Sequence, residues 1–229
     1  MLALISAALA PVVAIIAFIY WKDTHDKEPV GLLIKAFFMG IGAVVVTLIV
    51  SIVIGQFFVY RPDVVLDMFI HAFFGVSMVE ELSKFIFIAG ILYRSKHFDE
   101  PYDGIMYSIM VGMGFAGLEN VLYVMDGGMG TAVMRALTAV PAHATFAVVM
   151  GYFMGLQKFK PNPKHPYMLY GLIGAILLHG FYDFFLFISF IPGVWIGALF
   201  SLIVGLILTF RAIRLHRAIK PFYREERNQ

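Results

Sequence analysis

The stretch Val79-Glu80-Glu81-Leu82-Ser83-Lys84 decides the fold, because it places three ionisable side chains in the middle of an apolar run from Met68 to Tyr93. One acid or lysine at the centre of a membrane helix costs about 2.5–3.5 kcal/mol on insertion scales. A helical bundle keeps such residues where they pair, line a water-filled cavity or take part in chemistry. Lys84 follows Glu80 by four residues and Glu81 by three, so its ammonium can reach either carboxylate.

The composition of the whole chain is typical of a membrane protein. Of its 229 residues, 61% are hydrophobic and only 14% are charged, which is far from the balance of a soluble domain. The chain contains no cysteine, which excludes disulfides, a thiol nucleophile and cysteine metal ligands. The first apolar run is interpreted as a retained helix and not as a signal peptide, because it continues past the cleavage-like Ala8-Leu9-Ala10 and no Lys or Arg precedes it.

Seven apolar segments are each long enough to cross a hydrocarbon core of about 30 Å. The connections between them are short and no internal repeat is visible, so the sequence predicts one integral-membrane domain over residues 1–229. The fold class predicted is an all-α bundle of about seven transmembrane helices. The segments are Leu2–Trp21, Leu32–Val59, Met68–Tyr93, Gly104–Met125, Ala132–Leu156, Tyr167–Phe190 and Val194–Ile213.

Basic residues gather in alternate connections and predict the orientation of the chain. Apart from Arg61, the remaining connections carry none. By the positive-inside rule the N-terminus is expected outside and the C-terminus in the cytoplasm. The basic residues of the expected cytoplasmic side are Lys22, Lys27, Arg94, Lys96, Lys158, Lys160, Lys164 and the Arg and Lys residues from Arg211 to Arg227.

Polar residues inside other segments are candidate partners of the central cluster. Counted at about 1.5 Å per residue, Glu80, Glu119, His143 and His179 fall between mid-membrane and the outer third. This common depth predicts a shared hydrophilic cavity. The candidates are Glu119, Asn120, His143, His179 and Asp183.

Spacing within each helix predicts local pairs. His179 and Asp183 are four residues apart, so the carboxylate can fix the tautomer of the imidazole. Glu119 and Tyr123 are also four apart, which would allow the phenol to donate to the carboxylate. Arg135 is expected to snorkel toward the outer surface.

Three further features are interpreted more simply. The charged run from Lys22 to Glu28 is expected to form a solvated turn, and His71 to lie at the membrane interface. Pro141 lies inside a predicted helix, where it can kink the backbone for packing or for a site.

The chemistry that fits paired glutamates, two histidines and an aspartate is activation of water. A glutamate in a low-dielectric site can act as general base, and nearby histidines can stabilise an oxyanion or protonate a leaving amine. No Gly-x-Ser-x-Gly elbow occurs, which disfavours serine chemistry. No cofactor is expected, although His and carboxylate side chains leave a metal possible. Structural interpretations also stay open: an ion pair that locks the bundle for Glu80, Glu81 and Lys84, a structural acid for Glu119, and interhelical hydrogen bonding for His143 and His179.

Several motifs occur together along the chain, and their combination is more specific than a lone Glu-Glu pair. They are Lys22-Asp23 through Glu28-Pro29, Glu80-Glu81-x-x-Lys84, His97-Phe98-Asp99-Glu100, Tyr102-Asp103-Gly104, Gly114-Phe115-Ala116 with Glu119-Asn120, His143, and His179-Gly180-x-Tyr182-Asp183. In these residues, over nearly its whole length, the chain resembles the PrsW family of bacterial intramembrane proteases. That family is related to the CAAX prenyl protease and bacteriocin-processing superfamily.

The resemblance implies a glutamic-type protease that cuts a single-span anti-sigma factor on its extracytoplasmic side and so releases a stress sigma factor. The partners implied are this substrate and the lipid bilayer of a bacterial cell, and no nucleic acid. The chain has Lys84 where the wider superfamily has Arg one residue later, Glu119 where it has His, and Asp183 where it has Asn. These departures argue against prenyl-protein processing and leave the role of Glu119 open.

The sequence therefore predicts Glu80 or Glu81 as general base and His143 and His179 as polarising and proton-donating groups. Two other classes are compatible with buried Glu and His: a proton-coupled transporter and a non-catalytic membrane sensor or scaffold. A transporter often shows inverted repeats and paired broken helices, and the sequence shows neither. The supporting residues predicted are Lys84, Glu119, Asn120 and Asp183.

Overall fold

The computed structural model describes residues 1–23, 27–160 and 164–227, and within these ranges the protein is helical with no β-strand. This confirms the predicted all-α fold class. The helices are α1 (Leu2–Lys22), α2 (Val30–Gly55), α3 (Val65–Ile70), the π-helical η1 (His71–Ser77), α4 (Met78–Gly90), the short 3₁₀ turn η2 (Leu92–Arg94), α5 (Pro101–Leu137), α6 (Ala139–Phe159), α7 (Tyr167–Phe187) and α8 (Ile196–Arg227).

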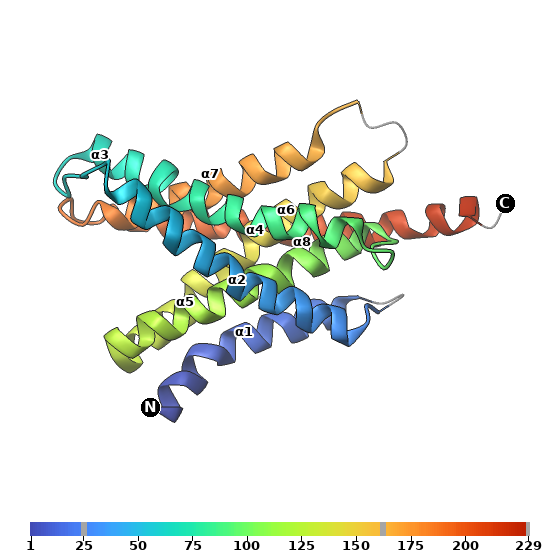
Figure 1. The fold of residues 1–229 in the computed structure, drawn as a ribbon, viewed down its shortest axis with the longest axis horizontal. Coiled ribbons are helices and arrows are strands. Elements are labelled where there is room, and N and C mark those ends of the chain that lie inside the picture. Colours follow the sequence, from blue (N-terminus) through green and yellow to red (C-terminus); the bar gives the residue numbers. More distant parts are fainter. Residues whose placement is uncertain (24–26, 161–163, 228–229) are drawn as a thin grey trace.

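Within the described residues, five helical stretches are long and apolar enough to cross a membrane, and one of them is the 59-residue stretch that joins α5 and α6. Each predicted segment lies mostly in helix, including the continuous run of α3, η1 and α4 that carries the charged centre, although α2 ends at Gly55, before the predicted Val59, and α7 ends at Phe187, before the predicted Phe190. The number of crossings and the orientation stay predictions. Figure 1 shows the two termini at opposite ends of the long axis, the arrangement that an odd number of passes requires.

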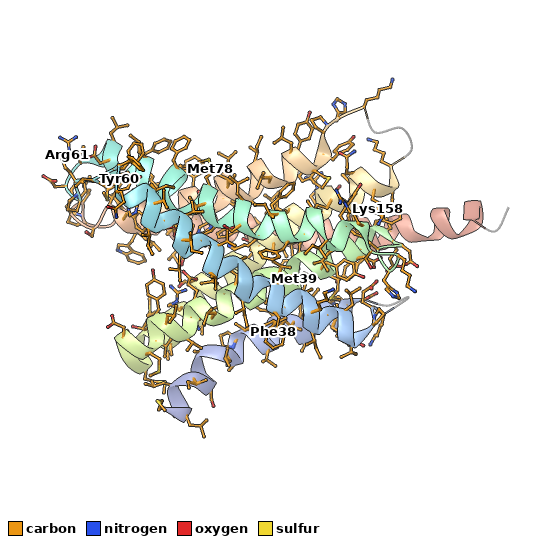
Figure 2. The ribbon with its side chains drawn as sticks, in the orientation of Figure 1. Phe38, Met39, Tyr60, Arg61, Met78 and Lys158 are labelled. Atoms are coloured by element: carbon orange, nitrogen blue, oxygen red, sulfur yellow. The ribbon has the colours of Figure 1, made fainter. Side chains whose placement is uncertain are left out.

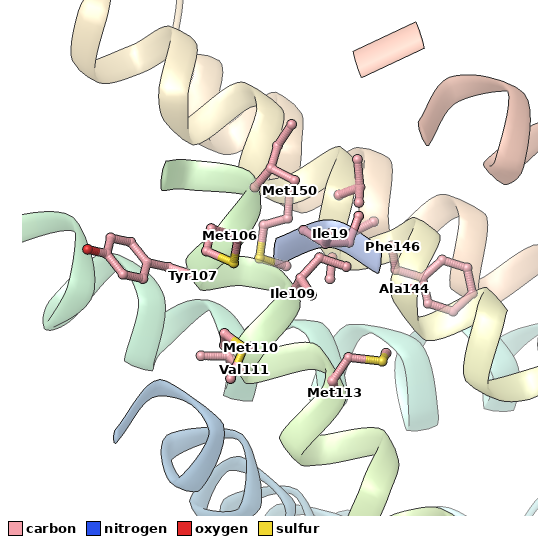
Figure 3. Close-up of a cluster of buried hydrophobic side chains, with 14 of the residues drawn as sticks. Ile19, Met106, Tyr107, Ile109, Met110, Val111, Met113, Ala144, Phe146 and Met150 are labelled. Carbon is pink, nitrogen blue, oxygen red and sulfur yellow. The ribbon is translucent and has the colours of Figure 1, made fainter. Parts of the chain in front are cut away.

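The core is built around the first half of α5, where every residue from Pro101 to Gly117 is buried. Its methionines pack against α6 and α1 in the cluster of Figure 3, which labels Met106, Met110 and Met113 of α5 with Phe146 and Met150 of α6. Glycines let the backbones of helices α5 and α6 come close together. A Cβ atom on Gly104 would overlap the Gly151 carbonyl oxygen, and one on Gly151 would overlap that of Gly104.

Of the two predicted boundaries around residue 130, one is confirmed and one is wrong. The expected break between Met125 and Ala132 is present, because the backbone leaves helical geometry at Gly128, with φ 73° and ψ −163°, and two helices meet there under the one label α5. Glycine alone adopts such angles without strain. The segment predicted over Ala132–Leu156, however, is interrupted. The next break falls at Thr138, so Pro141 lies in the first turn of α6 and does not kink a helix interior. A proline there removes no helical hydrogen bond.

The run from Lys22 to Glu28 is not simply a solvated turn. Residues 24–26 lie outside the described part, but Asp23 and Glu28 on either side are buried. The Tyr107 hydroxyl of α5 donates to the Glu28 carboxylate, and Tyr102 donates to the Ile19 carbonyl of α1 at 3.1 Å. This connection is therefore fastened to the start of α5.

That start is capped by its own side chains. The Asp103 carboxylate accepts hydrogen bonds from the backbone N–H groups of Asp99 and Glu100 at 2.9 and 2.8 Å, and Pro101 occupies the first turn. Lys158 anchors the end of α6 to this region through the Tyr93 carbonyl at 2.8 Å. Figure 2 labels Lys158 at this end of the molecule and Arg61 at the other.

Candidate active site

A single buried ammonium group lies at the centre of the charged cluster. Lys84 Nζ is 2.7 Å from Glu81 Oε1 and 3.4 Å from Glu80 Oε2. It is also 3.4 Å from His143 Nδ1 and lies 4.0 Å from the centroid of the Phe115 ring. An ammonium that contacts two carboxylates and an aromatic face compensates part of the cost of burying all three charges.

The two glutamates face different surroundings, as their separation of about 100° around a helix requires. Glu81 has no exposed surface, and its Oε2 atom has no hydrogen-bond partner. Glu80 lines a cavity, and its carboxylate oxygen Oε2 is 4.0 Å from His179 Nε2. Of the two acids, Glu80 is thus the one that meets the contents of the cavity.

The π-helical turn η1 immediately precedes this pair. Each π turn accommodates one extra residue, which rotates all following side chains by about 100° relative to the preceding α-helix. This rotation helps to set which of Glu80 and Glu81 faces the cavity. The sequence carries no visible signal for it.

His179 of α7 lies between two carboxylates. Its Nδ1 is 2.9 Å from Glu81 Oε1, and its Nε2 is 3.1 Å from Asp183 Oδ2. The predicted contact with Asp183 is present, but the other ring nitrogen meets Glu81 and is not left free. A doubly protonated imidazolium donates from both ring nitrogens, so an acceptor beside each nitrogen favours this form of His179.

His143 of α6 has different partners. Its Nε2 is 2.9 Å from Glu119 Oε2 of α5, and its Nδ1 faces Lys84. Because an ammonium can only donate, Nδ1 is the acceptor and the proton of the neutral ring is on Nε2. The two histidine rings lie next to each other, with centroids 5.2 Å apart.

The predictions for Arg135 and Tyr123 are wrong. Arg135 does not snorkel: its Nη2 donates to Glu119 Oε2 at 2.8 Å and its Nε to Asn120 Oδ1 at 2.7 Å. The Tyr123 hydroxyl does not donate to Glu119; instead, the centroid of its ring lies 4.1 Å from the guanidinium carbon of Arg135. Asn120 in turn donates to the Ala8 carbonyl of α1 at 2.7 Å.

These groups surround a cavity of about 730 Å³. A space of this size holds several peptide residues or a small ligand. The predicted site residues that line it are Glu80, Glu119, His143, His179 and Asp183; the predicted residues Glu81, Lys84 and Asn120 lie behind this wall.

Aromatic side chains form the other end of the cavity. His71 is half-buried there and stacks between Tyr60 and Phe187, at centroid distances of 4.4 and 5.0 Å. It is thus part of the cavity wall and does not simply lie at an interface. The cavity is lined by a charged end and an aromatic end, an arrangement suited to a peptide segment with apolar side chains.

The structure brings together all eight predicted site residues, although they come from four helices. Sequence reasoning missed Arg135, Tyr60 and Phe187 as parts of the site wall. The one feature of the sequence that could have assigned Arg135 to the site is its charge within an apolar segment. Its partner Glu119 is sixteen residues earlier, a separation that no helical spacing rule connects.

Comparison with known proteins gives one consistent result. Residues 28–214 match the family model described as PrsW family intramembrane metalloprotease. The chain is 34% identical over 226 residues to Protease PrsW of Geobacillus kaustophilus, covering 99% of this chain and 96% of that protein. It is 37% identical over 187 residues to Protease PrsW of Bacillus subtilis, covering 81% and 84% of the two chains. No solved structure matches.

The description of that family names a metal, and the residue types present include suitable ligands. Donor atoms of Glu80, Glu81, His143 and His179 all lie within 4.8 Å of one another. However, the Lys84 ammonium contacts three of these four groups. The positive charge of Lys84 would repel a divalent ion bound among the same donors. The side chains as arranged do not fit a metal ion, and no chemical step is derived through one.

Proposed function

We propose, because this chain belongs to the PrsW family of intramembrane proteases, that it hydrolyses a peptide bond of a single-span membrane protein in the cavity beside Glu80. The protein is a membrane-embedded peptidase with a multi-pass helical fold. One observation carries the assignment of the site. Glu80 is the glutamate that lines the cavity, while Glu81 and Lys84 are buried behind it.

Glu80 is proposed as the general base. Its carboxylate takes a proton from a water molecule in the cavity, and the hydroxide oxygen forms a bond to the carbonyl carbon of the substrate. Collapse of the tetrahedral intermediate breaks the C–N bond, and a proton passes to the leaving amine. Glu80 contacts the Lys84 ammonium, which favours a base that begins the reaction as a carboxylate.

The two histidines are proposed to serve the other charges of the reaction. His179 lies between Asp183 and Glu81, which suits it to hold a proton that can be given to the leaving amine. His143 keeps a proton on Nε2 beside the cavity, where it faces Glu119 at 2.9 Å; a substrate carbonyl that enters next to Glu119 can accept a shared hydrogen bond from the same N–H and be polarised. Glu81, Lys84, Glu119, Asn120 and Asp183 are proposed as supporting residues.

The substrate class proposed is a single-span anti-sigma factor, cut toward its extracytoplasmic side. The resemblance of the motifs supports this choice, and so does the depth of the site. Glu80 and His179 fall in the outer half of the membrane if the N-terminus is outside. The cut would release a stress sigma factor through later steps in the bacterial cell.

The test is co-expression with each single-span anti-sigma factor of the same genome, tagged at both ends. We expect one of them to be cut. Glu80→Gln and Glu81→Gln should each abolish the cut while the protein still inserts. Loss of a general base, here Glu80, typically lowers a rate by about 10²–10⁴-fold. Glu81→Gln removes the carboxylate that contacts both Lys84 and His179. Asp126→Asn alters an exposed acid of α5 and is the matched control.

Two results would contradict the proposal. A well-folded double Gln variant that cuts at the normal rate would refute the glutamate mechanism. Absence of cleavage of every anti-sigma factor would refute the substrate class, and cleavage of another single-span protein by the same preparation would leave the protease chemistry intact.

A further inference from the structure

The outer part of α5 returns toward the site, which a straight helix could not do. Arg135 follows Glu119 by sixteen residues, a distance of about 24 Å along an uninterrupted α-helix. The turn at Gly128 instead brings Arg135 Nη2 to 2.8 Å from Glu119 Oε2. The backbone at this glycine is therefore what makes the contact possible.

Arg135 is held in one geometry by three residues of the preceding helix. Its Nη2 and Nε atoms donate to Glu119 and Asn120, and the guanidinium lies over the ring of Tyr123. Only 15% of its side chain is exposed. A planar guanidinium with two fixed donors and a stacked face is a rigid arrangement that lysine cannot reproduce.

The carboxylate that Arg135 holds also binds a histidine of the site. Glu119 Oε2 accepts from Arg135 Nη2 and contacts His143 Nε2 at 2.9 Å. His143 Nδ1 faces Lys84. Two contacts therefore keep the ring proton of His143 on Nε2: the Lys84 ammonium, which can only donate, at Nδ1, and the Glu119 carboxylate, which Arg135 holds in place, at Nε2.

We propose that Arg135 is a positioning residue, which acts through Glu119 to fix the ring orientation and the tautomer of His143. This inference rests on the proposed function, in which His143 meets the carbonyl of the substrate. Arg135 does not itself touch the reacting atoms. The alternative is that Arg135 only ties the two halves of α5 together.

The first experiment needs no substrate. Protein labelled with ¹⁵N-histidine reports the protonation of each ring nitrogen, and the His143 signals are assigned by their loss in His143→Gln. We expect a protonated Nε2 and an unprotonated Nδ1 in the unmodified protein. In Arg135→Gln the second tautomer should become detectable, although Lys84 still faces Nδ1 and opposes it. Arg135→Lys should cause a smaller change, because lysine keeps the positive charge but not the two fixed donors of the guanidinium.

The second experiment measures cleavage of the single-span substrate by the same variants. Arg135→Gln should lower kcat about 10–100-fold, the usual effect of losing a partner that orients a histidine, with little change in KM. In the Glu119→Gln background, Arg135→Gln should have no further effect, because the two residues act as one unit.

Arg61→Gln is the matched control. Arg61 also bonds a carboxylate, with Nε 2.7 Å from Asp67 Oδ2, but 68% of its side chain is exposed and it does not line the cavity. Figure 2 labels Arg61 in the connection between α2 and α3. This variant should leave both the His143 spectrum and kcat unchanged.

Two outcomes would overturn the inference. If the tautomer of His143 is unchanged in Arg135→Gln, whatever happens to kcat, Arg135 has only a structural role. If kcat is unchanged while the tautomer mixes, the positioning does not serve the reaction. If instead His143→Gln keeps full activity, the proposed role of His143 fails, and the spectrum still decides whether Arg135 sets its tautomer.

Discussion

Two adjacent glutamates of one helix have different surroundings, and this difference decides their chemistry. Glu81 is closed off and contacts Lys84 and His179, whereas Glu80 meets the cavity. The same contrast separates the two histidines. His179 lies between carboxylates, and His143 lies between a carboxylate and an ammonium. The protonation state of each of these four side chains thus depends on the groups that contact it and not only on its residue type.

At this scale the first prediction compares His179 with Asp183. His179→Ala should remove a direct participant and lower the cleavage rate about 10²–10⁴-fold. Asp183→Asn keeps the shape but weakens control of the ring, so its loss should be about 10–100-fold. Initial rates at matched membrane levels measure both. Equal loss in the two variants would show that Asp183 does more than orient His179, and a near-normal His179→Ala would make this histidine structural.

A second prediction at the residue scale concerns metal. Because the Lys84 ammonium contacts three of the four candidate ligands, we expect the purified protein to cut substrate without a bound divalent ion. Metal analysis of active protein and cleavage after chelation check this. Stoichiometric zinc whose removal abolishes cleavage, and whose return restores it, would contradict the prediction.

Three irregular points of the helices build the site. The π turn η1 rotates the glutamate pair, the turn at Gly128 returns Arg135 to Glu119, and the break at Thr138 starts the helix that carries His143. At the opposite end, regular elements meet through capping and buried polar contacts. There the connection before α2 packs on α5 through Glu28 and Tyr107.

This contact makes a prediction about pH. Burial raises the pKa of Glu28 above its ordinary value of 4.5, and the charge of Asp99 acts in the same direction. Hydrogen bonds with the side chains of Tyr107 and Asp103 and the charge of His97 lower this pKa and offset part of the rise. The folded protein then binds this proton more tightly than the unfolded chain, so Glu28 lowers stability as pH rises from about 4.5 through the raised pKa.

Glu28→Gln should remove this contribution, and the melting temperature of the variant in detergent should fall less between pH 4 and pH 8 than that of the unmodified protein. Asp63→Asn, which changes an exposed acid of a connection, is the control and should leave the profile unchanged. Parallel profiles for Glu28→Gln and the unmodified protein would contradict the expected direction.

In the described part of the chain, successive long helices run in alternating directions between the two ends of the long axis (Figure 1). Apart from Arg61, the basic residues of the connections and of the tail belong to the segments at the end that holds the C-terminus. The positive-inside rule places that end in the cytoplasm. The cavity, lined by residues from Ser51 of α2 to Phe187 of α7, is then nearer the outer surface.

Reporter fusions test this topology. A fluorescent protein fused after Gln229 should fold and fluoresce in the cytoplasm, and a phosphatase inserted next to Asp63 should be active outside. A tail fusion that is active only outside the cytoplasm would reverse the orientation, and with it the side of the proposed cut.

Sequence alone determined the helical fold class, the seven apolar segments, and the set of buried polar residues that share a site. These follow from properties that are local along the chain: hydropathy over about twenty residues, and spacing of three or four residues within a helix. The i,i+4 contact of His179 with Asp183 and the contacts of Lys84 with both glutamates are of this kind.

Only the tertiary structure decided which glutamate meets the cavity, which partners fix each histidine, and that Arg135 belongs to the site. These depend on rotation of a helix about its axis and on contacts between residues far apart in the chain. A single π turn or one glycine with positive φ changes them, and neither leaves a periodic pattern in the sequence. The cost of leaving a buried charge unpaired then selects the one packing in which Glu119 meets both His143 and Arg135.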